Sequence, residues 1–344
     1  MLFLVNVEER IPQDHPLRPI KKMADEALKR LSRSFDRMYS SRGRPSVPPE
    51  RLLKAMVLMA LYGIRSEVLL CEQLEYNMLF RWFLDMDMVE TPFDHCAFSD
   101  NRKRLLEHDA AGKFFRQVVR FGKEANLMSD EHFSVDGTLL EAWASLKSFR
   151  PKDEDDDDTD NNGWSDFKGK KRSNETHESK TDPEAKLMRK GNGKEAKLSF
   201  IGHVLMENRN GLIADGKVTE ANGRAEREAA VELLKKQPRA KTAGLDAGYN
   251  TRKFVAACRE LGITPHVAGK KKYSAIDGRT TRHSGYTVSQ RIRKRIEQIM
   301  GWGKDRGCLR KARLRGVARN NFIFLITAAA YNLLRISRLL ATPA

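Results

Sequence analysis

The sequence predicts an all-helical N-terminal domain followed by an α/β domain with a mixed sheet. Apolar residues recur at helical spacing through the first 127 residues, and strand-like alternation begins near residue 131. Beyond that point the patterns of strand, strand pair, helix, strand, helix, strand and long helix succeed one another, an order typical of an α/β domain. A chain of 344 residues is long enough for two such domains.

Residues 1–127 are predicted to form the helical domain. Helical patterns cover residues 20–39, two helices within 46–84, and 97–126. Pro48 and Pro49 fit a helix start, Gly63 fits a helix end, and Ser66 fits an N-cap. Basic turns separate these helices. This combination favours DNA binding, although most helical domains do not bind DNA.

Residues 128–320 are predicted to form the α/β domain, and residues 321–344 a C-terminal helix that packs on it. We expect strands around Asp136 and over 198–206, 212–218, 241–245 and 264–268, with helices over 224–236 and 251–261. An amphipathic helix is expected over 289–304. The apolar stretch 322–334 is interpreted as a buried helix that is too short to span a bilayer.

Residues 151–193 are polar and poor in apolar groups. They contain an acidic run over 153–160, followed by cations over 168–172. We expect a disordered insertion here, because such a segment cannot bury enough apolar surface to fold. The acidic run is interpreted as a solvated, self-repelling segment and not as a metal site.

The composition favours a polyanionic partner. Lys and Arg total 63 against 46 Asp and Glu, a formal net charge of +17, which suits nucleic acid before a membrane surface. The four cysteines form no CxxC pair, so they support neither a zinc site nor a disulfide framework and fit a reduced cytosol. No secretory signal precedes the first charged residues, and we expect a cytoplasmic protein without a membrane partner.

Three acidic residues are candidates for a common site. Asp136 lies inside a strand-like run, Asp246 follows a strand, and Glu297 lies on the long helix between Arg293 and Lys304, near one face. Two of them have a structural alternative. Asp136 fits a strand-end or turn aspartate that uses the following glycine, and Glu297 fits a solvated helix with internal ion pairs.

If Asp136, Asp246 and Glu297 converge, their chemistry is constrained. Three carboxylates without histidine or thiol suit Mg²⁺ or Mn²⁺. Two such ions, roughly 3.5–4 Å apart, can support an in-line displacement at phosphorus by water or by a DNA 3′-hydroxyl. The cations around Glu297, among them Arg291 and Arg293, would then hold the phosphate backbone of the substrate strand.

The motifs VDGT at Asp136, GLDAGY at Asp246 and RKRIEQIMGWGK around Glu297 resemble those of DDE transposases of the bacterial insertion-sequence type, which have an RNase H-like catalytic core. The spacing from Arg293 through Glu297 to Lys304 matches the third-acid helix of that family. The family often has tyrosine where this chain has Gln290. The resemblance covers nearly the whole chain apart from the acidic segment.

The resemblance implies that Asp136, Asp246 and Glu297 ligate Mg²⁺ or Mn²⁺ and that Arg293 and Lys304 contact DNA. Trp302 would stack on an unpaired base, with a packed tryptophan as an equally expected alternative. A dimer on DNA would bind terminal inverted repeats, hydrolyse the element ends and transfer the 3′-hydroxyls to target DNA. The alternatives are a metal-dependent nuclease without strand transfer and a non-catalytic DNA-binding descendant of a transposase.

Overall fold

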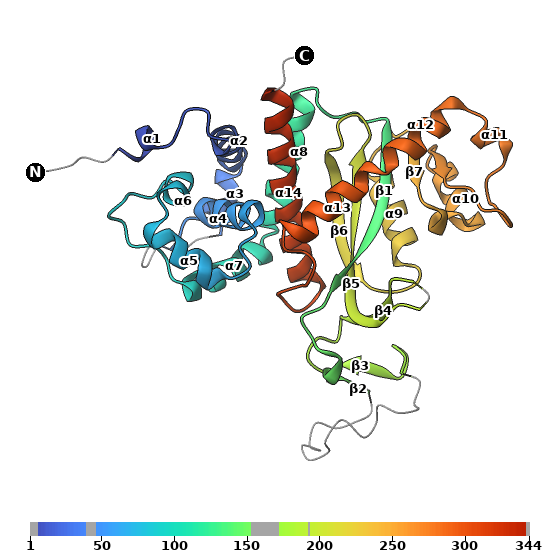
Figure 1. The fold of residues 1–344 in the computed structure, drawn as a ribbon, viewed down its shortest axis with the longest axis horizontal. Coiled ribbons are helices and arrows are strands. Elements are labelled where there is room, and N and C mark those ends of the chain that lie inside the picture. Colours follow the sequence, from blue (N-terminus) through green and yellow to red (C-terminus); the bar gives the residue numbers. More distant parts are fainter. Residues whose placement is uncertain (1–5, 39–45, 153–171, 192, 342–344) are drawn as a thin grey trace, which may run out of the picture.

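The computed structural model describes residues 6–38, 46–152, 172–191 and 193–341. The N-terminal helices gather on one side of the molecule, away from the sheet (Figure 1). They are α1 Val7–Arg10, α2 Leu17–Lys29, α3 Ser32–Asp36, α4 Pro49–Tyr62, α5 Glu67–Tyr76, α6 Met78–Phe83, α7 His95–Glu107 and α8 Ala110–Glu124.

The predicted helix boundaries around α4 and α5 are confirmed. Pro49 is the first residue of α4, where the missing N–H costs nothing, and Gly63 ends the helix with a φ of +69°. The Ser66 hydroxyl accepts a hydrogen bond from the Leu69 N–H at 3.3 Å and caps α5.

Three of the helices expected in the N-terminal part are each divided into two. The second helix expected within 46–84 is divided between α5 and α6 at Asn77. The pattern over 20–39 is divided between α2 and α3 by a break at Arg30 and Leu31, and Tyr39 lies outside the described residues. The pattern over 97–126 is divided between α7 and α8 at His108 and Asp109. Asp109 has a φ of +50°, a left-handed conformation that aspartate tolerates better than most residues.

The six-stranded sheet is mixed, as predicted. Its strands are β1 His132–Glu141, β4 Lys186–Arg189, β5 Ala196–Glu207, β6 Ile213–Glu220, β7 Thr242–Leu245 and β8 Thr264–Val267. The order is β4-β5-β1-β7-β8, with β6 also paired to β5. Strand β1 is antiparallel to β5 and parallel to β7, and β7 is parallel to β8.

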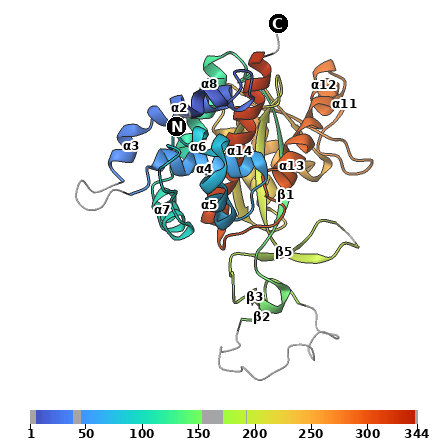
Figure 2. The ribbon, with the colours of Figure 1, turned by 60° about the vertical axis from the view of Figure 1, so that its left-hand side comes forward.

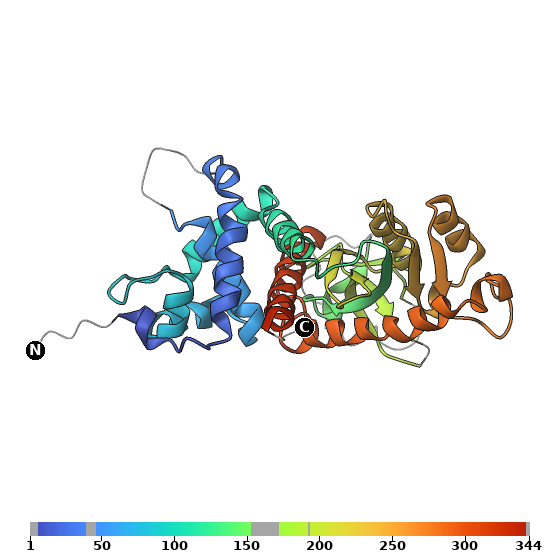
Figure 3. The ribbon, with the colours of Figure 1, turned by 90° about the horizontal axis from the view of Figure 1, so that it is seen from above.

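Helices cover both faces of this sheet. Helices α9 Ala225–Lys235 and α10 Arg252–Glu260 pack on one face. The other face carries α12 Ser284–Arg293, α13 Arg295–Asp305 and α14 Val317–Ala341, with the short α11 Gly278–Thr281 before them. Figure 3 shows α12 and α13 almost in line along the sheet. The missing side chain of Gly202 in β5 allows α14 to pack close to the sheet, because a Cβ at this position would lie 2.6 Å from the Phe324 ring of α14.

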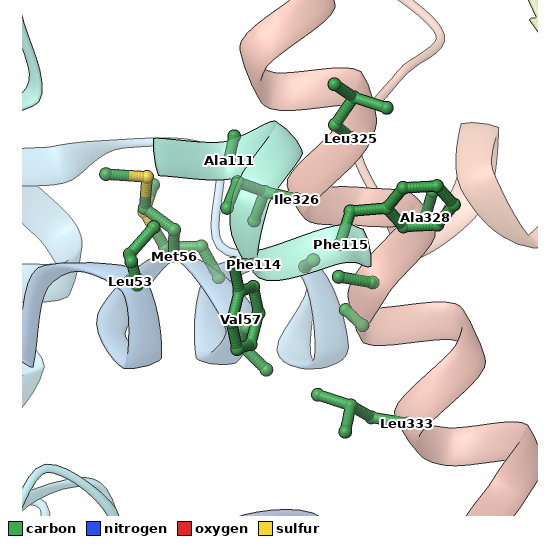
Figure 4. Packing of buried hydrophobic residues seen from close by; sticks show 14 of the residues in the cluster. Leu53, Met56, Val57, Ala111, Phe114, Phe115, Leu325, Ile326, Ala328 and Leu333 are labelled. Carbon is green, nitrogen blue, oxygen red and sulfur yellow. The ribbon is translucent and has the colours of Figure 1, made fainter. Parts of the chain in front are cut away.

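Helix α14 lies between the N-terminal helices and the sheet (Figures 2 and 3). Leu53 and Val57 of α4, Phe114 of α8 and Leu333 of α14 belong to one cluster of buried residues (Figure 4). On the sheet side, the buried Asn332 accepts from the Ile213 N–H at 2.9 Å and donates to its carbonyl at 2.8 Å. The expected boundaries at residues 127 and 320 stay a prediction.

The expectation about the length of the apolar C-terminal stretch was wrong. Helix α14 extends beyond 322–334 at both ends and has 25 residues, so by length and composition it could cross a membrane. In the structure, 61% of the most apolar 18-residue stretch of α14 is buried against the rest of the protein, as in the core helix of a soluble domain.

The expectation of disorder over 151–193 was wrong for residues 172–191. Strand β2 Phe149–Pro151 pairs with β3 His177–Ser179, and β4 forms an edge of the main sheet. The buried Asp182 accepts from the Gly316 N–H at 3.2 Å just before α14. The acidic run over 153–160 lies outside the described residues.

Candidate catalytic site

Asp136 lies on β1, and Asp246 directly follows the neighbouring strand β7. The parallel pairing aligns Ser134 of β1 with Gly244 of β7, so two residues further on Asp136 lies level with Asp246 just past the end of β7. Asp136 accepts a hydrogen bond from the Gly137 N–H at 2.8 Å. Asp246 accepts from the Gly248 N–H at 2.8 Å and so caps a short 3₁₀ helix. Both carboxylates are therefore held by the backbone at one edge of the sheet.

The pKa of the Asp136 carboxyl is raised to about 6. Burial is the main cause, and the nearby charges of Asp246 and Glu226 act in the same direction. The Gly137 N–H and the Arg293 guanidinium oppose this rise. Two neighbouring carboxylates repel each other when both are charged, and a bound cation stabilises this doubly charged state.

Glu226 is an acid of this region that the sequence did not reveal. It lies in the first turn of α9, and a Cβ on Gly137 would be 2.9 Å from its Oε1. Burial raises the pKa of Glu226, and so does the charge of Asp246. Helix α9 is rich in Ala and Glu, and a glutamate in such a helix has the pattern of a solvated face, so nothing in its spacing marked Glu226.

Tyr249 also belongs to this region. Its side chain is buried, and its hydroxyl has no hydrogen-bond partner among the described residues. Burial raises its pKa well above the usual value, and the carboxylates of Glu226, Asp136 and Asp246 raise it further. The tyrosine is part of the GLDAGY motif, but the motif did not show that its ring lies beside the acids.

Glu297 is exposed on α13, the helix that packs against β1. No three Asp, Glu, His or Cys side chains of the described residues are close enough together to hold a metal ion. The structure thus brings Asp136 and Asp246 together, while the contribution of Glu297 stays a prediction. The nearby donors are hard carboxylate oxygens, which fit Mg²⁺ or Mn²⁺.

The helix expected over 289–304 begins at Ser284 and is interrupted at Lys294. There the Glu297 N–H bonds to the Lys294 carbonyl at 3.2 Å, three residues back, which separates α12 from α13 by a tighter turn. The interruption places Arg293 at the end of α12 and Glu297 in the first turn of α13.

Gln290 fixes α12 on the sheet. Its side-chain amide donates to the carbonyls of Leu245, at 3.2 Å, and His266, at the carboxyl ends of β7 and β8. Its carbonyl oxygen accepts from the Arg293 Nε at 3.3 Å. Gln290 therefore holds Arg293 close enough to lower the pKa of Asp136. Gln290 thus has a positioning role for Arg293.

The other predicted DNA-binding residues lie further along the two helices. Arg291 is exposed, whereas Lys304 is half-buried and has a pKa lowered by burial and by the charges of Lys190 and Arg310. The Trp302 ring packs edge-on against Tyr331, with 5.5 Å between the centroids. The packing alternative therefore accounts for the position of Trp302.

The mixed sheet, with one acid on β1, one directly after β7 and a basic helix beside them, agrees with the RNase H-like fold expected from the sequence. Two family models match this chain: "Transposase domain (DUF772)" over residues 5–104 and "Transposase DDE domain" over residues 129–333. The protein belongs to the DDE transposase family.

Two solved structures resemble the chain at low identity. One is a piggyBac transposase synaptic complex with hairpin DNA, with 11% identity and a TM-score of 0.43, covering 94% of this chain and 75% of that one. The other is a pre-cleavage Mos1 transpososome, with 12% identity and a TM-score of 0.20, covering 97% and 98%. No curated protein matches the sequence significantly.

Proposed function

We propose that this transposase is an insertion-sequence enzyme that hydrolyses DNA at the ends of its element and transfers the 3′-hydroxyls to target DNA. The observation that carries the proposal is the pair Asp136 and Asp246 at one sheet edge, with Arg293 beside it. Family membership supports transposition as the overall activity.

In this proposal Asp136, Asp246 and Glu297 hold Mg²⁺ or Mn²⁺. When bound, the ions supply activation of the attacking oxygen and stabilisation of the leaving one. Arg293, oriented by Gln290, offers a planar guanidinium to the phosphate beside the acids. Arg291 and Lys304 extend this positive surface along α12 and α13 for the DNA backbone.

The partners follow from the same proposal. The N-terminal helices bind the terminal inverted repeats, and the sheet domain receives the cleavage point. Two ends must be joined together, so the protein acts as a homodimer on DNA. It works on DNA in the bacterial cytoplasm, at the nucleoid.

The test is Mg²⁺-dependent cleavage of DNA that carries the flanking repeats of the element. The Asp246→Asn variant should lose more than about 100-fold in rate, because even outer-shell partners of metal ligands typically contribute 10–100-fold. The matched control is Asp130→Asn, a surface aspartate that pairs with Arg239 at 3.1 Å and should cleave normally. Equal cleavage by both variants would remove Asp246 from the site.

Two other functions remain distinguishable by experiment. A nuclease without strand transfer would cut the repeats but fail to join a pre-cut end to target DNA. A non-catalytic DNA-binding descendant would bind the repeats and cut neither with Mg²⁺ nor with Mn²⁺.

A further inference from the structure

A cavity of about 460 Å³ lies where the N-terminal helices meet the segment that leads into α14. Helices α4, α5 and α7 line it on one side and residues between 307 and 327 on the other. Part of its wall is apolar, made by Met56, Met59, Phe98 and Ile326. None of its lining residues belongs to the acidic site on the sheet edge.

Three arginines from distant parts of the chain also line this cavity. Arg65 follows α4, Arg102 comes from α7, and Arg313 precedes α14. Glu67 is the one acid among the described lining residues, and it pairs with Arg102. The cavity wall therefore carries two positive charges that no lining acid balances.

Two of the three arginines are held in place by hydrogen bonds. The Arg313 guanidinium donates to the carbonyl of Ile64 at 3.2 Å and to that of Arg65, which fixes it against the turn after α4. Arg102 donates to the Ser99 hydroxyl at 3.2 Å on its own helix. The third arginine, Arg65, is exposed.

This concentration of positive charge is unfavourable without a ligand. Burial lowers the pKa of Arg102, and the neighbouring charges of Arg319 and Arg313 lower it further. The pKa of Arg313 is lowered by burial and by the charge of Arg65. Partly buried like charges cost free energy that a bound anion removes.

A phosphate group has the chemistry that this cavity fits. Guanidinium groups match phosphate oxygens in planar, paired hydrogen bonds, and the apolar wall can receive an attached sugar. We propose that the cavity between α4, α7 and the segment before α14 binds a backbone phosphate of DNA, as a second contact separate from the acidic site. This rests on DNA being the partner in the proposed function.

The experiment measures binding of a repeat-end duplex by fluorescence anisotropy in EDTA, across a range of salt concentrations. Arg65→Gln removes a cavity cation without disturbing a hydrogen bond of another side chain. The matched control is Arg259→Gln, an exposed arginine in the last turn of α10, outside the N-terminal helices and the cavity. Arg65→Gln should weaken binding about tenfold and reduce the slope of log K against log salt by about 1, as expected for one lost phosphate contact.

Glu67→Gln gives a result of opposite sign. It removes the acid that competes for Arg102, so DNA affinity should rise above that of the unmodified protein. Equal affinity and equal salt slope for Arg65→Gln, Glu67→Gln and Arg259→Gln would overturn the proposal. If the unmodified protein and Arg259→Gln bound no DNA at all, the proposed function itself would fail.

Inorganic phosphate, tested by thermal unfolding of the same proteins, separates the two sources of the group. DNA as the source predicts that affinity for the duplex changes in the cavity variants. If phosphate stabilises the unmodified protein but not Arg65→Gln, and the duplex binds all variants equally, the cavity is a site for a free anion and the DNA contact is overturned.

Discussion

Asp136 sets the pH dependence at the scale of single residues. Its pKa is raised to about 6, chiefly by burial, and only the charged carboxylate ligates a cation. As pH falls through about 6 a proton replaces the metal, so Mg²⁺-dependent cleavage should fall about tenfold per unit below that value. Initial rates between pH 5 and 8 measure this. A flat profile across pH 6 would contradict it.

Glu226 should tune that profile. Its charge helps to raise the pKa of Asp136, so Glu226→Gln should move the midpoint of the cleavage profile to lower pH. The control is Glu228→Gln, an exposed residue of the same helix, which should leave the midpoint in place. A shift of equal size in both variants would show that the effect comes from overall charge and not from the position of Glu226.

Packing of α14 on the sheet can be tested at the scale of elements. A Cβ on Gly202 would lie 2.6 Å from the Phe324 ring, so Gly202→Ala must displace either the ring or the helix. We expect a loss of about 1–3 kcal/mol in the free energy of unfolding, measured with urea. Gly269→Ala is the control, since nothing lies within 4 Å of its Cβ position. Equal free energies of unfolding for both variants would show that α14 or the Phe324 ring can shift without loss of stability.

Local signals explain which elements could be predicted. Pro49, Gly63 and Ser66 act through backbone geometry within a few residues, so the ends of α4 and α5 followed from the sequence. The break at Asp109 carries no glycine or proline and could not be seen. Strand β4 is too short and too charged to show alternation, and it is fixed by pairing with β5.

The candidate site was only partly visible for a related reason. Asp136 was found because an aspartate inside a strand opposes strand propensity, and Asp246 because an acid followed by a glycine turn ends a strand pattern. Glu226 reaches the sheet only because Gly137 has no side chain, which is a tertiary relation. The cavity that contains the three arginines is lined by residues more than 200 positions apart in the chain, and hydrophobic periodicity cannot predict such a long-range contact.

The whole molecule should unfold as one unit. Buried residues of helix α14, of the N-terminal helices and of the sheet form one cluster. Unfolding of either part would therefore expose apolar residues of α14 that the other part also contacts. We expect coincident urea transitions by far-ultraviolet circular dichroism and by tryptophan fluorescence. Two separated transitions would show that the helical part and the sheet part are independently stable.

The most direct test of the account is Mn²⁺ binding, measured by calorimetry without DNA, for the unmodified protein and for Asp246→Asn. The account predicts that the unmodified protein binds Mn²⁺ and that the variant loses at least about tenfold in affinity, because one of two neighbouring carboxylates is gone. Asp130→Asn should bind as the unmodified protein does. Equal Mn²⁺ affinity for Asp246→Asn and the unmodified protein would contradict a metal site at this edge of the sheet.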